Sequence, residues 1–118
     1  MSKQIEFSDG SRRILFFVRG RGRGHAVPSL EIVNKLEASL PDVEIRLVSY
    51  GTGARTLEQH GRTVFDLDLP EQNPGIETIV LAGRLVGWLQ PDLVVAHEEF
   101  SALPAARIFD RPAVFLTD

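Results

Sequence analysis

Short apolar runs alternate along this chain with longer segments in which apolar residues recur every three or four positions. The first run, Ile14 to Val18, has five apolar residues followed by a glycine loop, which is typical of a strand buried on both faces of a parallel sheet. Pro28 suits the first turn of the helix that follows, which we expect to end at Leu40. The rest of the pattern predicts strands at 43–49, 63–67, 93–96 and 113–116, and helices at 54–60, 76–90 and 101–109.

This alternation predicts an α/β fold, a Rossmann-like, doubly wound parallel sheet of about five strands with helices on both faces. The usual strand order in such sheets is 3-2-1-4-5, which places the first and fourth strands side by side. His25 follows the first of these strands, and His97, Glu98 and Glu99 follow the other. We therefore expect the two groups to meet at the C-terminal edge of the sheet, although they lie far apart in the sequence.

The composition is that of one globular domain. The chain has 118 residues, of which 43% are hydrophobic and 25% are charged. We expect residues 1–11 to form a flexible N-terminal arm and residues 12–118 to form the domain. No apolar run approaches the roughly 20 residues that span a bilayer, and the first residues lack the apolar core of a signal peptide. The absence of cysteine excludes disulfides and agrees with a cytoplasmic location.

The predicted helix at 76–90 is apolar around almost its whole circumference, with Glu77, Thr78 and Arg84 as interruptions. One apolar side of the helix should pack on the sheet, and the opposite apolar side then has to be shielded from water. Ordinary loops of the domain can shield it. The alternatives are further polypeptide, a second subunit or a lipid acceptor, the last of which would bring the protein to the inner face of the membrane as a peripheral contact.

Positive charge is concentrated near the first strand. The net charge of −3 argues against a general affinity for nucleic acids, yet five arginines lie between Asp9 and Glu31 with no acid among them. This distribution predicts a local anion site. An RNA-binding role for the RGRGRG segment is disfavoured, because the segment is short and has no interleaved aromatic residues.

The glycine loop does not match the nucleotide fingerprints that it superficially suggests. The motif G-x-G-x-x-G fails because His25 takes the place of the third glycine and no acid ends the second strand; the P-loop motif fails because no lysine follows the glycines. A phosphate or diphosphate can still bind where a glycine loop precedes a helix. The alternative is that the glycines only turn the chain and the arginines are solvated. The predicted phosphate contacts are Gly20, Arg21, Gly22, Arg23, Gly24 and His97.

Two segments carry a resemblance to a known family. The segment GRGRGHAVPSLEIVNKL resembles the G-x-G-H-x-x-P signature at the start of GT-B glycosyltransferases, which include MurG-like and UDP-glycosyltransferase-like enzymes. The segment QPDLVVAHEEFSALPAARIFDRPAVFLTD is similar to a second stretch of the same enzymes. Together they bracket residues 13–118 in the order found in the family. The resemblance implies the N-terminal, acceptor-binding domain of such an enzyme.

The resemblance also implies a chemistry, the transfer of a sugar from a nucleotide-sugar, by preference a UDP-sugar, to an acceptor hydroxyl with inversion. His25 would be the general base, because an imidazole suits proton removal from a poor nucleophile near neutral pH. A carboxylate on the far ring nitrogen would orient it, with Glu99 as first candidate and Glu98 as second. The acid that relatives often have just after the fourth strand aligns here with His97, which is a departure from the family.

Each candidate has a structural alternative. His25 can be a loop histidine that caps the next helix, and His97, Glu98 and Glu99 can form a solvated turn. His25, His97 and a glutamate have suitable ligand types for a metal but no supporting spacing, so we predict neither a metal nor a bound cofactor. His60 is expected to cap the C-terminus of a surface helix.

The expected partners follow from the same resemblance. They are a sugar acceptor, with a lipid-linked one among the alternatives, and a nucleotide-sugar-binding domain or subunit. The chain ends where the fifth predicted strand ends, so we expect the 118 residues alone to be inactive. The alternative function is a non-catalytic subunit of the same fold that binds a phosphorylated ligand or a partner chain.

Overall fold

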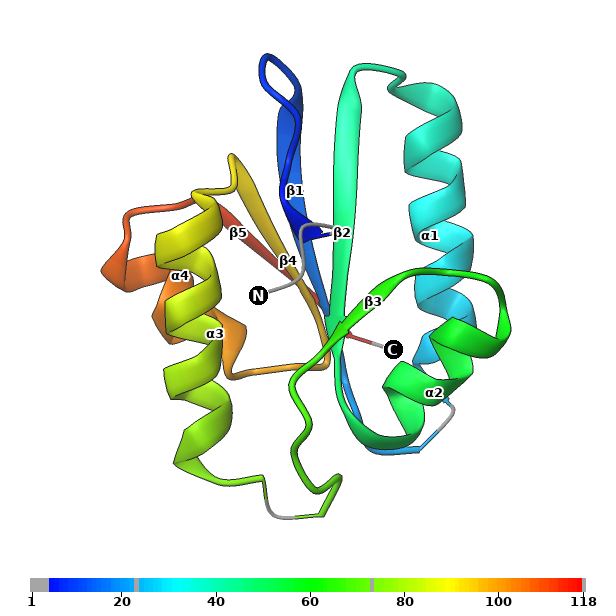
Figure 1. Ribbon diagram of the computed structural model, residues 1–118, viewed down its shortest axis with the longest axis vertical. Coiled ribbons are helices and arrows are strands. Elements are labelled where there is room, and N and C mark those ends of the chain that lie inside the picture. Colours follow the sequence, from blue (N-terminus) through cyan, green and yellow to red (C-terminus); the bar gives the residue numbers. More distant parts are fainter. Residues whose placement is uncertain (1–4, 23, 73, 118) are drawn as a thin grey trace.

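The computed structural model describes residues 5–22, 24–72 and 74–117. In this part of the chain, five strands form one parallel sheet in the order β3-β2-β1-β4-β5, which confirms the predicted doubly wound arrangement (Figure 1). The strands are β1 (Arg12–Val18), β2 (Val43–Ser49), β3 (Val64–Asp66), β4 (Leu93–His97) and β5 (Ala113–Leu116). The helices are α1 (Ala26–Ser39), α2 (Gly51–Gln59), α3 (Ile76–Leu89) and α4 (Ala102–Ile108).

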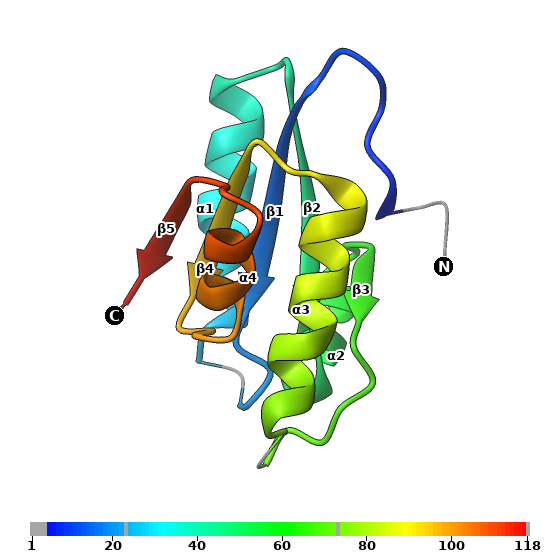
Figure 2. The ribbon, with the colours of Figure 1, turned by 90° about the vertical axis from the view of Figure 1, so that its left-hand side faces the viewer.

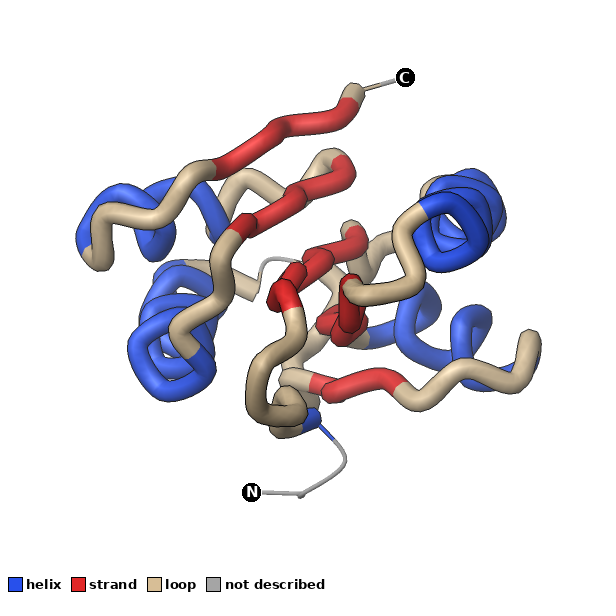
Figure 3. Tube along the Cα trace, turned by 90° about the horizontal axis from the view of Figure 1, so that it is seen from above, coloured by secondary structure: helices blue, strands red, loops and turns tan. Residues whose placement is uncertain are grey.

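The sheet lies between two layers of helices, with α1 and α2 on one face and α3 and α4 on the other (Figure 3). The side chains of successive residues in β1 point alternately to the two faces of the sheet. Phe17 packs in the cluster that contains Leu85 of α3, whereas Phe16 packs in the cluster that contains Val33 of α1. Because both faces are covered, the central strand is apolar at every position from Ile14 onward, as its sequence predicts.

All strands run in the same direction, so their C-terminal ends share one edge of the sheet, the lower edge in Figure 1. β1 is central, and its last residue, Val18, pairs with His97 of β4. Figure 2 shows α3 and α4 side by side over one face, with β5 at the outer edge of the sheet. The loops that begin at the C-terminal edge therefore gather in one place.

The start of α2 differs from the prediction, which placed a turn at Gly51 and Gly53. Both glycines lie inside the helix, which begins three residues before the predicted Ala54. A Cβ atom on Gly53 would lie 2.5 Å from the carbonyl oxygen of Arg19. Gly53 N–H also donates to the carbonyl of Gly20 at 2.8 Å. Gly53 therefore permits a close approach of two backbones. In the sequence, a glycine that serves this purpose cannot be distinguished from a glycine in a turn.

The described part of the predicted arm, residues 5–11, packs on the domain. Ile5 is buried in the same core as Leu85, and the guanidinium of Arg46 donates to the carbonyl of Glu6 at 3.0 and 3.2 Å. The same guanidinium lies 5.3 Å from the ring centroid of Phe7. The buried Ile5 and the guanidinium of Arg46 thus hold this segment against the domain, although its polar composition predicts a flexible arm.

Helix α3 is buried on one side, as expected. Ala82, Leu85 and Val86 are buried, whereas Ile76 is 73% exposed and Trp88 is 40% exposed. Among the described residues, then, no loop covers the outer side of this helix fully. No helix in the described ranges has the length and apolar character needed to cross a membrane.

Candidate functional site

Four loops meet at the C-terminal edge of the sheet, one after each of β1, β2, β3 and β4 (Figure 1). Backbone hydrogen bonds connect the strand ends: Arg19 N–H donates to the carbonyl of His97 at 3.2 Å. This contact confirms that the glycine loop and the end of β4 lie together, as the predicted strand order requires. The candidate catalytic and binding residues lie in these loops or at the strand ends that precede them.

His25 stands at the entrance to α1 with φ −107° and ψ −18°, in the N-cap position, and is half-buried. The structure shows no side-chain capping hydrogen bond from it to α1. Its ring meets the ring of His97 edge to face, with centroids 5.3 Å apart and planes at 85°. A histidine of the glycine loop and a histidine of β4 are thus direct neighbours.

His97 is the last residue of β4 and is only 2% exposed. Its Nδ1 lies 2.6 Å from the hydroxyl oxygen of Ser29, a fully buried residue in the first turn of α1. The backbone N–H of Ser29 in turn donates to the carbonyl of His25 at 3.0 Å. We call His25, His97 and Ser29 the histidine cluster; it lies on the face of the sheet that α1 covers.

Glu99 belongs to a different network. Its Oε1 accepts a hydrogen bond from the hydroxyl of Tyr50 at 2.9 Å, and its Oε2 accepts one from the hydroxyl of Ser101 at 2.5 Å. Tyr50 is part of the core on the α3 and α4 face, opposite Ser29. This placement differs from the expectation that Glu99 orients His25, because both carboxylate oxygens are bound on the other side of the sheet.

Burial, and then the charge of Glu99, raise the pKa of Tyr50 well above its usual range. Tyr50 therefore stays protonated and remains a donor to the carboxylate over the physiological pH range. Sequence reasoning did not single out this tyrosine. The available signal was an aromatic residue with a hydroxyl directly after β2, at the edge where the other candidates were expected.

Glu98 has a left-handed backbone, with φ +56°. Its N–H donates to the carbonyl of Leu116 at 2.9 Å, and its Oε1 accepts from the hydroxyl of Thr117 beyond the end of β5. The carboxylate of the second candidate is therefore held toward the outer edge of the sheet.

The glycine loop is anchored at one end and exposed beyond it. A Cβ atom on Gly20 would lie 2.3 Å from Cδ2 of Tyr50, so the tyrosine ring occupies the space that a side chain would need. Arg21, Gly22 and Gly24 are exposed, and Gly22 has φ +76°. Arg23, which was also predicted to contact phosphate, lies outside the described residues.

A second feature that sequence reasoning missed is Glu71, in the loop before α3. Its Oε2 accepts hydrogen bonds from the backbone N–H of Thr52, at 2.9 Å, and from the Thr52 hydroxyl. The hydroxyl first, and then the N–H, lower the pKa of the Glu71 carboxyl. Because Thr52 lies in the first turn of α2, Glu71 binds a helix N-terminus from another loop.

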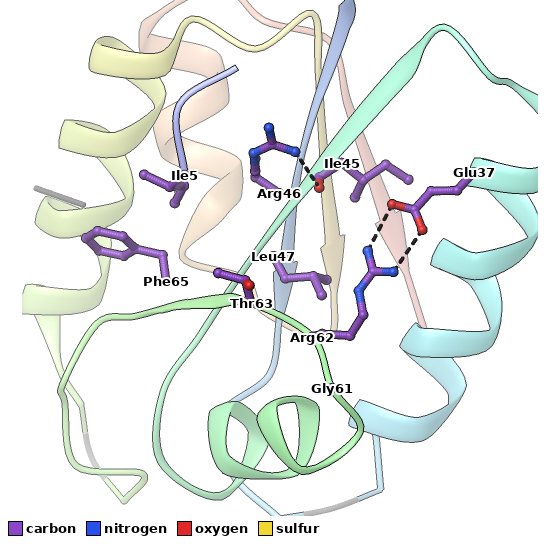
Figure 4. Close-up of a pocket in the computed structure, with 9 residues that line it drawn as sticks. All are labelled: Ile5, Glu37, Ile45, Arg46, Leu47, Gly61, Arg62, Thr63 and Phe65. Atoms are coloured by element: carbon purple, nitrogen blue, oxygen red, sulfur yellow. Dashed lines mark hydrogen bonds and ion pairs between the residues drawn. The ribbon is translucent and has the colours of Figure 1, made fainter. Parts of the chain in front are cut away.

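A cavity lies away from these loops. It has a volume of about 340 Å³ and sits beside the first half of β2, where β3 does not reach (Figure 4). Arg62 forms a two-pronged ion pair with Glu37 on its wall, at 2.9 Å for each hydrogen bond. The cavity is lined by Ile5, Glu37, Ile45, Arg46, Leu47, Gly61, Arg62, Thr63 and Phe65. Within the described ranges, no three acidic or histidine side chains are grouped as metal ligands.

Solved structures that resemble this chain include glycosyltransferases and UDP-N-acetylglucosamine 2-epimerases. MurG from Acinetobacter baumannii matches with a TM-score of 0.69 and 18% identity over 90% of this chain. The calicheamicin glycosyltransferase CalG4 matches with a TM-score of 0.66 and 25% identity over 90%. The 2-epimerase from Neisseria meningitidis, solved with UDP-GlcNAc bound, matches with 0.63 and 16% over 86%.

This chain spans 35%, 32% and 30% of those three proteins, respectively. The similarities confirm, at the level of the fold, the resemblance to GT-B glycosyltransferases, and they extend the same fold to the epimerases. No protein-family profile matches the sequence, and no curated protein matches it.

Proposed function

We propose that this chain carries the acceptor side of a glycosyltransferase that uses a nucleotide-sugar, with His25 as the general base. The observation that carries the proposal is the position of His25, at the start of α1 and in ring contact with the buried His97. Ligands of doubly wound sheets bind at the C-terminal edge where the strand order reverses, and β1 and β4 flank that point here.

The proposed step is a single displacement. A ring nitrogen of His25 takes the proton of the acceptor hydroxyl while the hydroxyl oxygen bonds to the anomeric carbon. The bond from that carbon to the diphosphate oxygen breaks, and the nucleoside diphosphate leaves with the electron pair. The configuration at the anomeric carbon inverts as a result. A half-buried imidazole suits this role, because it reaches a ligand and is still restrained by its neighbours.

The glycine loop is the proposed contact for phosphate groups. Arg21 is exposed there, the backbone at Gly22 and Gly24 is open to solvent, and the positive end of α1 follows directly. A UDP-sugar is favoured as the donor because the similar structures include an epimerase solved with UDP-GlcNAc. The chain spans about a third of the similar enzymes, so we place most donor contacts in polypeptide beyond these 118 residues, in the same chain or a partner subunit.

A second candidate function is a non-catalytic binding subunit of the same fold. The outer side of α3 favours it, because Ile76, Val80 and Trp88 are 73%, 47% and 40% exposed and lie on one helix. Such an exposed apolar surface suits the binding of a partner chain or of a lipid-linked acceptor. A cytoplasmic location and peripheral membrane contact stay predictions.

The test is a titration of the isotopically labelled chain with UDP-GlcNAc and, separately, with a short-chain lipid diphosphate, followed by NMR. We expect the lipid diphosphate to shift the resonances of 20–25, and His25→Ala to reduce that binding at least severalfold. The matched control is His60→Ala, which removes the histidine at the C-cap of α2, whose Nδ1 lies 2.9 Å from the carbonyl oxygen of Thr56 in that helix. A folded chain that binds neither compound would contradict the acceptor-side function.

A further inference from the structure

His97 is a buried histidine that the proposed reaction does not itself use. Burial of an imidazole is costly unless its nitrogens are hydrogen-bonded. Ser29 meets this need at Nδ1, at 2.6 Å, and Ser29 is itself fully buried. The bond joins α1 to the end of β4 and fixes the rotation of the His97 ring.

The fixed ring of His97 forms one wall of the space that His25 occupies. The two centroids are 5.3 Å apart and the planes are at 85°, the edge-to-face geometry that aromatic pairs prefer. A ring in such a contact cannot turn freely about its Cβ–Cγ bond without losing it. Orientation of this kind matters for a general base, since its nitrogen must point at the proton it removes.

The two glutamates are held by other partners. Glu99 accepts hydrogen bonds from Tyr50 and Ser101 on the α3 and α4 face, whereas His97 lies with Ser29 on the α1 face. Glu98 accepts from Thr117 at the β5 end. The ring contact with His25 is made from the end of β4 by His97.

We propose that His97, anchored by Ser29, is the positioning residue for His25, in the place where a carboxylate was expected. The inference rests on the proposed role of His25 as general base. His97 acts through the orientation of its neighbour and need not touch the substrate. An imidazole at this position supplies orientation without the full negative charge of a carboxylate.

The experiment is a long-range nitrogen–hydrogen NMR correlation of the His25 imidazole in the 118-residue chain at one fixed pH. Ser29→Ala is the main variant, because it removes only the hydroxyl that anchors His97 and retains the histidine itself. Ser29→Cys, nearly isosteric and a weak donor, should give an intermediate result. His97→Ala removes the ring contact, and Glu99→Gln is the control on the opposite face.

We expect Ser29→Ala to weaken the cross-relaxation between the two rings, and we expect both Ser29→Ala and His97→Ala to move the His25 ring nitrogen shifts away from their values in the unmodified chain. Glu99→Gln should leave both signals unchanged. A backbone amide spectrum of each variant shows that the fold is kept. The inference is overturned if Glu99→Gln moves the His25 signals, or if Ser29→Ala changes only those of His97.

This outcome is separable from that of the proposed function. Unchanged His25 signals in a Ser29→Ala chain that still binds the lipid diphosphate overturn the role of His97 alone. Absence of lipid diphosphate binding in the unmodified chain overturns the acceptor-side function, while the ring signals still decide whether His97 orients His25.

Discussion

The hydroxyl of Tyr50 donates to Oε1 of Glu99 at 2.9 Å and joins the loop after β2 to the loop after β4. Both residues are buried, at 4% and 7% exposure, and the Tyr50 ring also occupies the space next to Gly20. One side chain thus connects three of the four loops at the C-terminal edge of the sheet. The folding stability of the chain should depend on it.

Tyr50→Phe should lower the free energy of unfolding by about 1–3 kcal/mol, because it leaves a buried carboxylate oxygen without its donor. The aromatic ring beside Gly20 is kept, so the loss reports the hydrogen bond rather than packing. Urea denaturation of the two proteins, followed by circular dichroism, measures the difference.

A double-mutant cycle with Glu99→Gln identifies the partner. Residues bonded directly to each other show coupling of about 0.5–3 kcal/mol, whereas independent residues add within a few tenths. Additive effects of Tyr50→Phe and Glu99→Gln would show that the two side chains do not stabilise each other in solution.

Gly20→Ala should destabilise the chain by about 1–3 kcal/mol, the usual cost of forcing extra volume into a packed site. Its Cβ would lie 2.3 Å from Cδ2 of Tyr50, a ring that Glu99 holds in place. Gly24→Ala is the matched control in the same loop, because no described residue other than its chain neighbours has a heavy atom within 4 Å of the added Cβ. Equal midpoints of thermal unfolding for the two variants would contradict the close packing of Gly20 on Tyr50.

The carboxyl of Glu71 should titrate below its usual range of about 4.5. Its pKa is lower in the folded chain than in the unfolded chain, so the contribution to stability is present above about pH 4.5 and disappears as the pH falls through the lower folded value. Carbon-detected NMR titration of the side-chain carboxyl measures the midpoint.

Thr52→Val tests the cause of that shift. It removes the hydroxyl, which is the larger influence on the Glu71 carboxyl, and keeps the backbone donor. The midpoint should therefore rise part of the way toward its usual value. Glu77→Gln, which removes an exposed acid from the first turn of α3, is the control for a general change in charge. An equal shift in both variants would exclude the specific bond to Thr52.

Leu85→Ala should cost about 2–5 kcal/mol of folding stability, because a fully packed leucine is replaced by a cavity. Leu85 is 1% exposed, whereas Ile76, on the outer side of the same helix, is 73% exposed. Ile76→Ala is the matched control and should change the free energy of unfolding by less than about 0.5 kcal/mol. Similar losses in the two variants would mean that the outer side of α3 is covered in solution.

The sequence by itself determined the elements and their order. Apolar runs of strand length, alternating with helical periodicity, are local properties, and the five predicted strands all lie within two residues of the observed bounds. The strand order follows from the usual winding of such sheets, and it places His25 close to the end of β4.

The tertiary structure decided which polar side chains meet. In an unbroken strand His97 and Glu99 would lie on the same face, two positions apart. Glu98 adopts a left-handed backbone and interrupts that alternation, so His97 stays with Ser29 on the α1 face while Glu99 turns to Tyr50 on the other. The conformation of one loop residue depends on the hydrogen bonds it makes to β5, and no local pattern in the sequence specifies those.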